Sequence, residues 1–161
     1  MSRRISLMLL IPALVLLGAP PLATVTHSPG LALNGNNLAA TGVSSWPLVA
    51  GDSLATTTAA AMVMFPDQSR LALEKNSRVK LEQDGDKVVV RLLEGALSYR
   101  LGPGSRVQLS ALGRSLTPAS NLEGKVSIVG RQVVEGVVPP GTFSGSARPA
   151  VIPTHTPSKI K

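Results

Sequence analysis

The sequence contains no cysteine, two histidines and four aromatic residues among 161 positions. The lack of cysteine excludes disulfide bridges, thiolate zinc sites, iron–sulfur clusters and thiol nucleophiles. His27 and His155 stand near opposite ends of the chain, so they indicate neither a multi-histidine metal site nor a histidine general base. Proteins that bind single-stranded nucleic acid stack bases on aromatic platforms, and the aromatics here are scattered singly. We therefore expect no catalytic residues, no metal, no cofactor and no nucleic-acid partner.

Acidic residues are missing from both ends of the chain. The net charge is +7, but residues 31–138 are nearly balanced, with eleven basic and nine acidic residues. The excess comes from Arg3 and Arg4 at one end and from Arg148, Lys159 and Lys161 at the other. The basic balance is therefore a property of the flanks, and it does not indicate a nucleic-acid-binding face.

An uncharged segment, residues 5–25, directly follows Arg3 and Arg4 and has a leucine-rich centre. A positive start, an apolar centre and small residues after it are typical of a secretory signal peptide. Both candidate cleavage positions are poor, because Pro20 follows Ala19 and Pro21 lies two residues before Ala23. We predict that residues 1–25 are a signal peptide or an N-terminal membrane anchor. The remainder is then periplasmic or secreted, or is held at the inner membrane facing the periplasm; a buried helix of a cytosolic protein is the alternative.

Residues 31–138 show a hydrophobic period of two, which is typical of half-buried strands. Short intervals rich in Gly, Asn, Asp and Pro separate the strands. The pattern predicts an all-β domain, a single antiparallel sandwich or roll of short strands. At least six segments carry the alternation, and their apolar residues are Leu71 and Leu73; Val79 and Leu81; Val88, Val90 and Leu92; Leu97, Tyr99 and Leu101; Val107 and Leu109; and Val126, Ile128 and Val133.

Four local expectations follow. Asp84-Gly85 predicts a two-residue hairpin turn between strands 78–83 and 86–93. The strands of residues 60–112 are expected to form a meander, and the threonine-rich residues 56–65 to form one strand. Residues 139–161 are rich in Pro, Ser and Thr and poor in large apolar residues, so they are expected to form a mobile basic tail.

The order of short motifs between Trp46 and Leu101 resembles that of the FecR-like domain family, named from the ferric citrate regulator. The similarity is close over about 60 residues and loose over about 90. The turn has Gln68 where the family usually has glycine, which suggests that this position does not need a positive φ. The matching pieces are Gly51-Asp52 with Leu54 and Thr56; the strand 60–65; Pro66-Asp67-Gln68-Ser69-Arg70; Leu71-Ala72-Leu73; Asn76-Ser77; Val79-Lys80-Leu81; and Leu93-Glu94-Gly95 before Ala96-Leu97-Ser98-Tyr99.

Four residues are candidates for an interface: Trp46, Asp67, Ser69 and Asn76. Each also has a structural interpretation. Asp and Ser in turns usually bond nearby backbone amides, asparagine suits a left-handed turn position, and Trp46 before Pro47 suits a lid over a sheet edge. The glycines Gly51, Gly85 and Gly95 are expected at tight reversals or bulges.

The resemblance implies an exported, non-catalytic binding or signalling module of the cell envelope. Regulators of the family also carry a cytoplasmic portion that acts on a sigma factor, and the four residues before the apolar run are too few for one. Binding is expected through a sheet edge or through loops at one end of the strands, with an unidentified envelope protein or polymer. The alternative is a structural envelope protein whose basic tail contacts anionic polymer or lipid. Hydrolysis would need paired carboxylates, for which Asp52, Glu94, Glu123 and Glu135 are the candidates.

Overall fold

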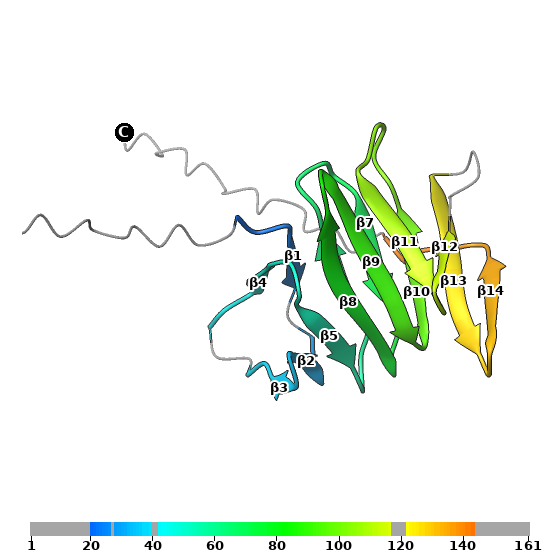
Figure 1. The fold of residues 1–161 in the computed structure, drawn as a ribbon. Helices are drawn as coiled ribbons and strands as arrows, with labels where there is room; N and C mark the ends of the chain where they lie inside the picture. Colours follow the sequence, from blue (N-terminus) through cyan, green and yellow to red (C-terminus); the bar gives the residue numbers. More distant parts are fainter. Residues whose placement is uncertain (1–19, 27, 40–41, 117–121, 144–161) are drawn as a thin grey trace, which may run out of the picture.

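The computed structural model describes residues 20–26, 28–39, 42–116 and 122–143. These residues form a sandwich of two seven-stranded β-sheets, so the predicted all-β fold is confirmed (Figure 1). No helix occurs in the described ranges, and hence none there is long and apolar enough to cross a membrane. The leader predicted for residues 1–25 lies mostly outside the described residues.

Sheet A is antiparallel throughout, in the order β14-β13-β10-β7-β6-β1-β4. Sheet B has the order β12-β11-β9-β8-β5-β2-β3, and its β9 and β11 run parallel. The strands of sheet A are β1 (Ala23–Thr26), β4 (Ser45–Leu48), β6 (Ala61–Met64), β7 (Arg70–Leu73), β10 (Ala96–Arg100), β13 (Glu123–Val129) and β14 (Gln132–Gly136). Those of sheet B are β2 (Leu31–Leu33), β3 (Asn36–Asn37), β5 (Ser53–Thr56), β8 (Ser77–Asp84), β9 (Lys87–Glu94), β11 (Val107–Ala111) and β12 (Arg114–Leu116).

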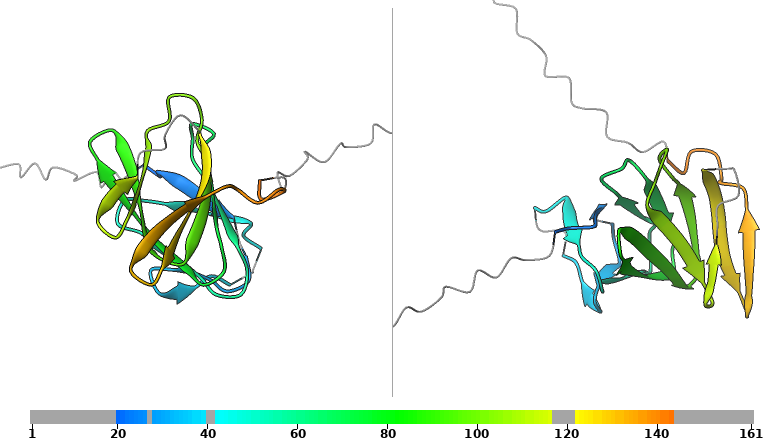
Figure 2. Two further views of the ribbon diagram at one scale, coloured as in Figure 1. Left: turned by 90° about the vertical axis from the view of Figure 1, so that its right-hand side faces the viewer. Right: turned by 45° about the horizontal axis from the view of Figure 1, so that its top comes forward.

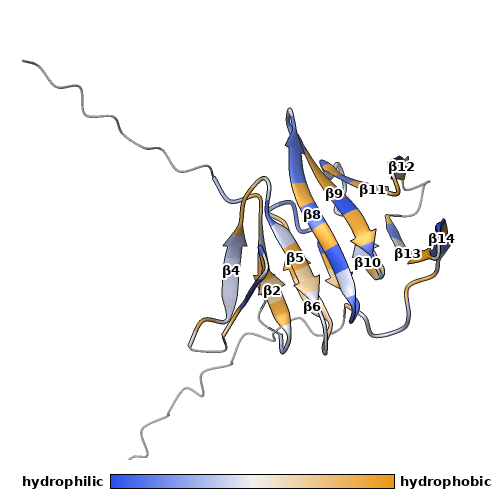
Figure 3. Ribbon diagram, turned by 60° about the horizontal axis from the view of Figure 1, so that its bottom comes forward, coloured by the Kyte–Doolittle hydropathy of each residue, from blue (hydrophilic) through white to orange (hydrophobic). Residues whose placement is uncertain are grey.

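The core lies between the two sheets and is built from the inward-facing residues of each strand. In β8, Val79 and Leu81 are buried, and the bands of Figure 3 show this alternation along the strand. On its outer side Glu82 forms ion pairs with Lys80 at 3.3 Å and with Arg91 at 2.7 Å. The predicted hydrophobic period of two thus reflects a strand with one face in the core and the other in solvent. The completely enclosed large side chains are Leu31, Leu48, Leu54, Leu71, Leu73, Leu81, Leu92, Leu97, Leu109, Val25, Val63 and Val79.

The prediction of a meander through residues 60–112 is wrong. The chain leaves sheet A after β7, returns with β10 and leaves again for β11. It advances from the β4 and β3 edge toward the β14 and β12 edge as it alternates, which the right-hand view of Figure 2 shows as the change from blue to orange. Hydrophobic alternation identifies strands but is the same in either sheet, so it carries no information on this order.

The predicted hairpin is present. Asp84 pairs with Lys87, so the two turn residues are Gly85 and Asp86, one position later than predicted. Gly85 has a φ of 61° at the first turn position, where the tight hairpin turns favour glycine.

The single strand predicted over residues 56–65 is also wrong, because β5 ends at Thr56 and β6 begins at Ala61. The hydroxyls of Thr57 and Thr58 donate to the carbonyl oxygens of Gly30 at 3.1 Å and Pro29 at 2.8 Å. These bonds hold a turn that carries the chain from one sheet to the other. Threonine favours strands by its branching, but its hydroxyl also stabilises turns.

Both predicted boundaries of the β domain shift outward. Strand β1 begins at Ala23, within the segment assigned to the leader, and Val25 is completely buried between β4 and β6. At the other end Phe143 is buried and lies 4.9 Å from the Arg100 guanidinium, in a cation–π arrangement. Residues 139–143 therefore belong to the described domain, whereas residues 144–161 of the predicted tail lie outside the described residues.

Candidate functional site

Three connections meet at one end of the sandwich, at the top of Figure 1. They are the β6–β7 turn (residues 65–69), the tip of the β8–β9 hairpin (residues 85–86) and the β10–β11 loop (residues 101–106). The strand register explains why these three connections lie together, because the start of β7 pairs with the end of β10, and the start of β9 pairs with the start of β11. We call this region the loop end.

A chain of hydrogen bonds joins the β6–β7 turn to the β10–β11 loop. The Gly102 N–H donates to the Ser69 hydroxyl at 3.0 Å, and the Ser69 and Ser105 hydroxyl oxygens lie 2.8 Å apart. The Ser105 hydroxyl donates to Asp67 Oδ2 at 2.7 Å. Since each hydroxyl has one proton, Ser69 is the donor toward Ser105. The chain of bonds ends on a carboxylate, which strengthens it.

The β6–β7 turn is itself closed by local bonds. Asp67 Oδ1 accepts a hydrogen bond from the Ser69 N–H at 2.9 Å, which is the backbone bond we predicted for an aspartate in a turn. The Gln68 N–H donates to the Phe65 carbonyl at 3.1 Å, and Gln68 has a φ of 70°. The turn does take a positive φ at Gln68, although the glutamine suggested that this position does not need one. The bonds on either side impose the left-handed conformation on a residue other than glycine.

The two segments approach closely through their backbones. A Cβ atom placed on Gly102 would lie 2.4 Å from the Asp67 carbonyl oxygen, which only glycine avoids. Ser69 is completely buried beneath this contact. The loop end is therefore a fixed surface supported by its own polar core.

This hydrogen-bond network lowers the pKa of the Asp67 carboxyl. Partial burial raises its pKa, but hydrogen bonds from the Ser105 hydroxyl and the Ser69 N–H, with a smaller one from the Arg106 N–H, outweigh that effect. The net result is a pKa below the ordinary value, so Asp67 is a stable anion at neutral pH.

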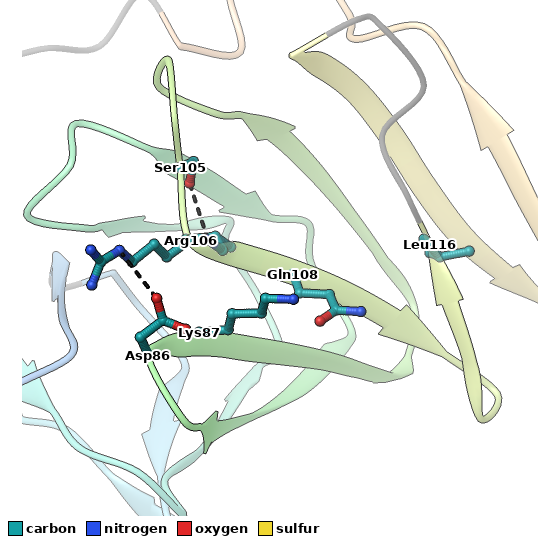
Figure 4. A pocket seen from close by; sticks show the side chains of 7 residues that line it. Asp86, Lys87, Ser105, Arg106, Gln108 and Leu116 are labelled. Atoms are coloured by element: carbon teal, nitrogen blue, oxygen red, sulfur yellow. Dashed lines mark hydrogen bonds and ion pairs between the residues drawn. The ribbon is translucent and has the colours of Figure 1, made fainter.

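The hairpin tip adds a second charged feature. Asp86 lies 3.7 Å from the Arg106 guanidinium, and both side chains are about two-thirds exposed (Figure 4). The Val88 N–H donates to the Arg106 carbonyl at 3.0 Å and continues the parallel β9–β11 pairing into the loop end. An exposed ion pair of this kind contributes little to stability, so its two charges remain accessible to a ligand.

Between these connections lies a shallow hollow of about 280 Å³. It adjoins a hollow of about 220 Å³ toward β1 and one of about 340 Å³ toward β12, and together we call them the loop-end groove. Apolar residues from both sheets line its centre, and charged residues stand at its rim. The apolar residues are Pro21, Leu22, Phe65, Pro66, Val88 and Val107, and the charged ones are Asp67, Asp86, Lys87 and Arg106.

The structure brings together only two of the four predicted interface residues. Asp67 and Ser69 lie at the loop end, where Ser69 is buried and Asp67 is exposed. Asn76 lies in the β7–β8 turn at the opposite end of β7 and has the predicted left-handed conformation, with a φ of 56°. Trp46 lies in the edge strand β4 and packs partly buried against the core, in agreement with the predicted lid.

Two of the four carboxylates considered for hydrolysis are engaged in contacts within the fold. Asp52 accepts hydrogen bonds from the Asn34 side chain at 2.7 Å and the Val49 N–H at 2.8 Å. Glu123 forms a two-bond pair with Arg100. In the described ranges no three His, Asp or Glu side chains lie close enough to hold a metal ion.

Several residues of the loop end escaped the sequence analysis. Pro21 and Leu22 fall within the predicted leader, and Asp86, Ser105 and Arg106 are not among the predicted interface residues. The signal available was that Ser105 follows a Gly-Pro-Gly turn, just as Ser69 follows a Pro-Asp turn. Recognising their meeting requires the β7–β10 pairing. No protein family, curated protein or solved structure matches this chain.

Proposed function

We propose that this chain is an exported FecR-like domain that acts as a non-catalytic binding or signalling module in the cell envelope, with the loop-end groove as its binding surface. The observation that carries the proposal is the fixed groove itself, an apolar centre built from both sheets with charges at its rim. Clefts with an apolar floor and a few placed polar groups are the usual form of ligand sites.

The chemistry of the groove favours a polypeptide ligand. Pro21 and Pro66 are exposed and offer apolar contact area, and Asp67, Asp86 and Arg106 offer both signs of charge for orientation. The polar network is occupied with holding the loops. The Ser105 oxygen accepts from the Val107 N–H at 3.1 Å and its proton goes to Asp67, so this hydroxyl is engaged in holding the loops.

The start of the described domain bears on export. The Leu22 N–H donates to the Leu48 carbonyl at 2.7 Å, and Ala23 is buried in β1. A cut after Ala23 would remove both from the fold, whereas a cut after Ala19 leaves β1 whole. Envelope fractionation with N-terminal sequencing should thus find the protein outside the cytoplasm, starting upstream of Leu22 or with its leader retained. Recovery from the cytosol, or a start at Thr24, would contradict this.

Binding at the groove is tested by site-specific photo-cross-linking of the full-length protein in its own cell. A cross-linker at exposed Pro66 should capture a defined envelope protein, and Arg106→Ala should reduce the yield several-fold. The matched control is a cross-linker at Ala60, which is also exposed but lies in the β5–β6 turn. Equal capture from both positions, or capture unaffected by Arg106→Ala, would refute the groove as the binding surface.

A further inference from the structure

Strand β14 is the most open edge of the sandwich in the described part of the chain. It is the last strand of sheet A and has five residues. The other edge strands are shorter: β3 has two residues, β12 has three, and β4 has four and is interrupted by Pro47. Short edges and proline are the usual protections against pairing with another chain, and β14 has neither.

The backbone of β14 offers free hydrogen-bonding groups at alternate residues. The Ile128 N–H of β13 donates to the Gly95 carbonyl at 2.8 Å, away from β14. Its neighbours Ser127 and Val129 therefore face β14, opposite Val134 and Gln132. Because the bonding direction alternates along a strand, the N–H and C=O groups of Val133 and Glu135 point to the open edge.

Several side chains along this edge are exposed to solvent. Val134 is 46% exposed and Val137 is 91% exposed. Arg131, in the turn that directly precedes β14, and Glu135 are exposed, and neither forms an ion pair or a side-chain hydrogen bond with another described residue. An unpaired glutamate beside the open edge disfavours pairing with most strands, since the added strand would have to supply a cation at the matching position.

We propose that β14 pairs with β14 of a second copy of this chain, antiparallel and about a two-fold axis through Val133. In this register residue numbers facing each other sum to a constant, so Val133 faces Val133 and Arg131 faces Glu135 of the other copy, twice. The two Val133 residues exchange both backbone hydrogen bonds. A register centred on Val134 places Glu135 opposite valine, and one centred on Glu135 opposes two glutamates, so the charges select the Val133 register.

The pairing extends sheet A from seven strands to a continuous fourteen across the two copies. The edge is short, and a two-strand contact of this length buries less surface than a standard stable interface. The dimer is therefore expected to dissociate on dilution into the micromolar range.

Charge reversal tests the proposed register on the full-length chain by sedimentation equilibrium from about 1 µM to about 300 µM. The protein should dimerise, and Arg131→Glu or Glu135→Arg alone should weaken dimerisation about tenfold or more, because each converts two attractions into repulsions. The double variant Arg131→Glu/Glu135→Arg should restore the dissociation constant to within about threefold. The matched control Arg78→Glu, at an exposed arginine of β8 in sheet B, should change it by less than about threefold.

Disulfide trapping adds a second readout that does not depend on affinity, because the chain has no cysteine of its own. Facing residues of a hydrogen-bonded antiparallel pair have Cα atoms about 5.5 Å apart, within the range of a disulfide. Val133→Cys should cross-link on oxidation, and Val134→Cys, displaced along the strand in this register, should not. A monomer at every concentration, no rescue by the double reversal, or equal cross-linking of both cysteine variants would overturn the proposal.

Discussion

Replacing Ser69 by alanine tests how far the loop end depends on its polar network. The Gly102 N–H is buried and donates to the Ser69 hydroxyl at 3.0 Å. Alanine removes this acceptor, and a buried N–H left without a partner costs about 1–3 kcal/mol. Ser105 keeps its bonds to Asp67 and Val107, so the loss is confined to the Ser69 contacts. We expect the free energy of unfolding to fall by about 2 kcal/mol.

The assay is urea denaturation for the free energy and thermal denaturation for the Tm, both followed by circular dichroism and by the fluorescence of Trp46, the single tryptophan. For a domain of this size each kcal/mol lowers the Tm by about 3–5 °C, so Ser69→Ala should lower it by about 6–10 °C. The matched control is Ser45→Ala at an exposed serine of β4, which should change stability by less than about 0.5 kcal/mol.

Coupling between the two serines is the sharper readout. If Ser69 and Ser105 act in one network, the cost of Ser69→Ala is smaller when Ser105 is already alanine, by about 0.5 kcal/mol or more. A Ser69→Ala loss no larger than that of the control, or strictly additive losses in the double variant, would refute the description of the loop end as one hydrogen-bonded unit.

Two further predictions concern the turns. The pKa of Asp67 is lowered in the folded state, so its carboxylate stabilises the fold above the ordinary carboxyl pKa of about 3.9, and this contribution is lost as pH falls through the folded value. The Tm difference between the native chain and Asp67→Asn should therefore be constant near neutral pH and shrink below about pH 4. A difference unchanged at pH 2 would contradict this. In thermal denaturation, Gly95→Ala should lower the Tm more than Gly130→Ala. Both glycines have a positive φ, but only at Gly95 would an added Cβ atom collide with backbone, 2.4 Å from the Asn76 carbonyl oxygen. Equal losses of Tm would show that the backbone conformation alone accounts for the cost.

Strands such as β8 were predictable from the sequence because they bury one face. Val79 and Leu81 point inward and Lys80 and Glu82 outward, a local pattern that needs no knowledge of neighbours. The order of strands was not predictable, since Leu71 in sheet A and Leu81 in sheet B are both buried on one face of their strand. Val25 illustrates a related ambiguity, because an apolar residue suits a membrane-targeting segment and a core strand equally well.

The candidate site was predictable only in part, for a similar reason. Asp67 and Ser69 belong to one turn, so their local bonding follows from the motif. Ser105 meets Asp67 across 38 residues of sequence, and that contact depends on the pairing of β7 with β10. The turn at Thr57 depends likewise on carbonyl groups 27 and 29 residues away. Hydrogen bonds between side chains and groups far away in the sequence are the contacts that a single sequence does not reveal.

The direction of the strands determines how the two loop-end grooves would be oriented in the proposed dimer. The loop-end groove involves β1, the β6–β7 turn, the β8–β9 tip and the start of β11, whereas the proposed dimer uses only β14. Both surfaces can therefore be occupied at once. Antiparallel pairing of β14 reverses the strand direction between copies, so the two loop ends face opposite ways. Such a dimer gains little avidity for one short ligand, because a single ligand cannot reach both grooves. It is instead suited to joining two separate partner molecules, one at each end of the extended sheet.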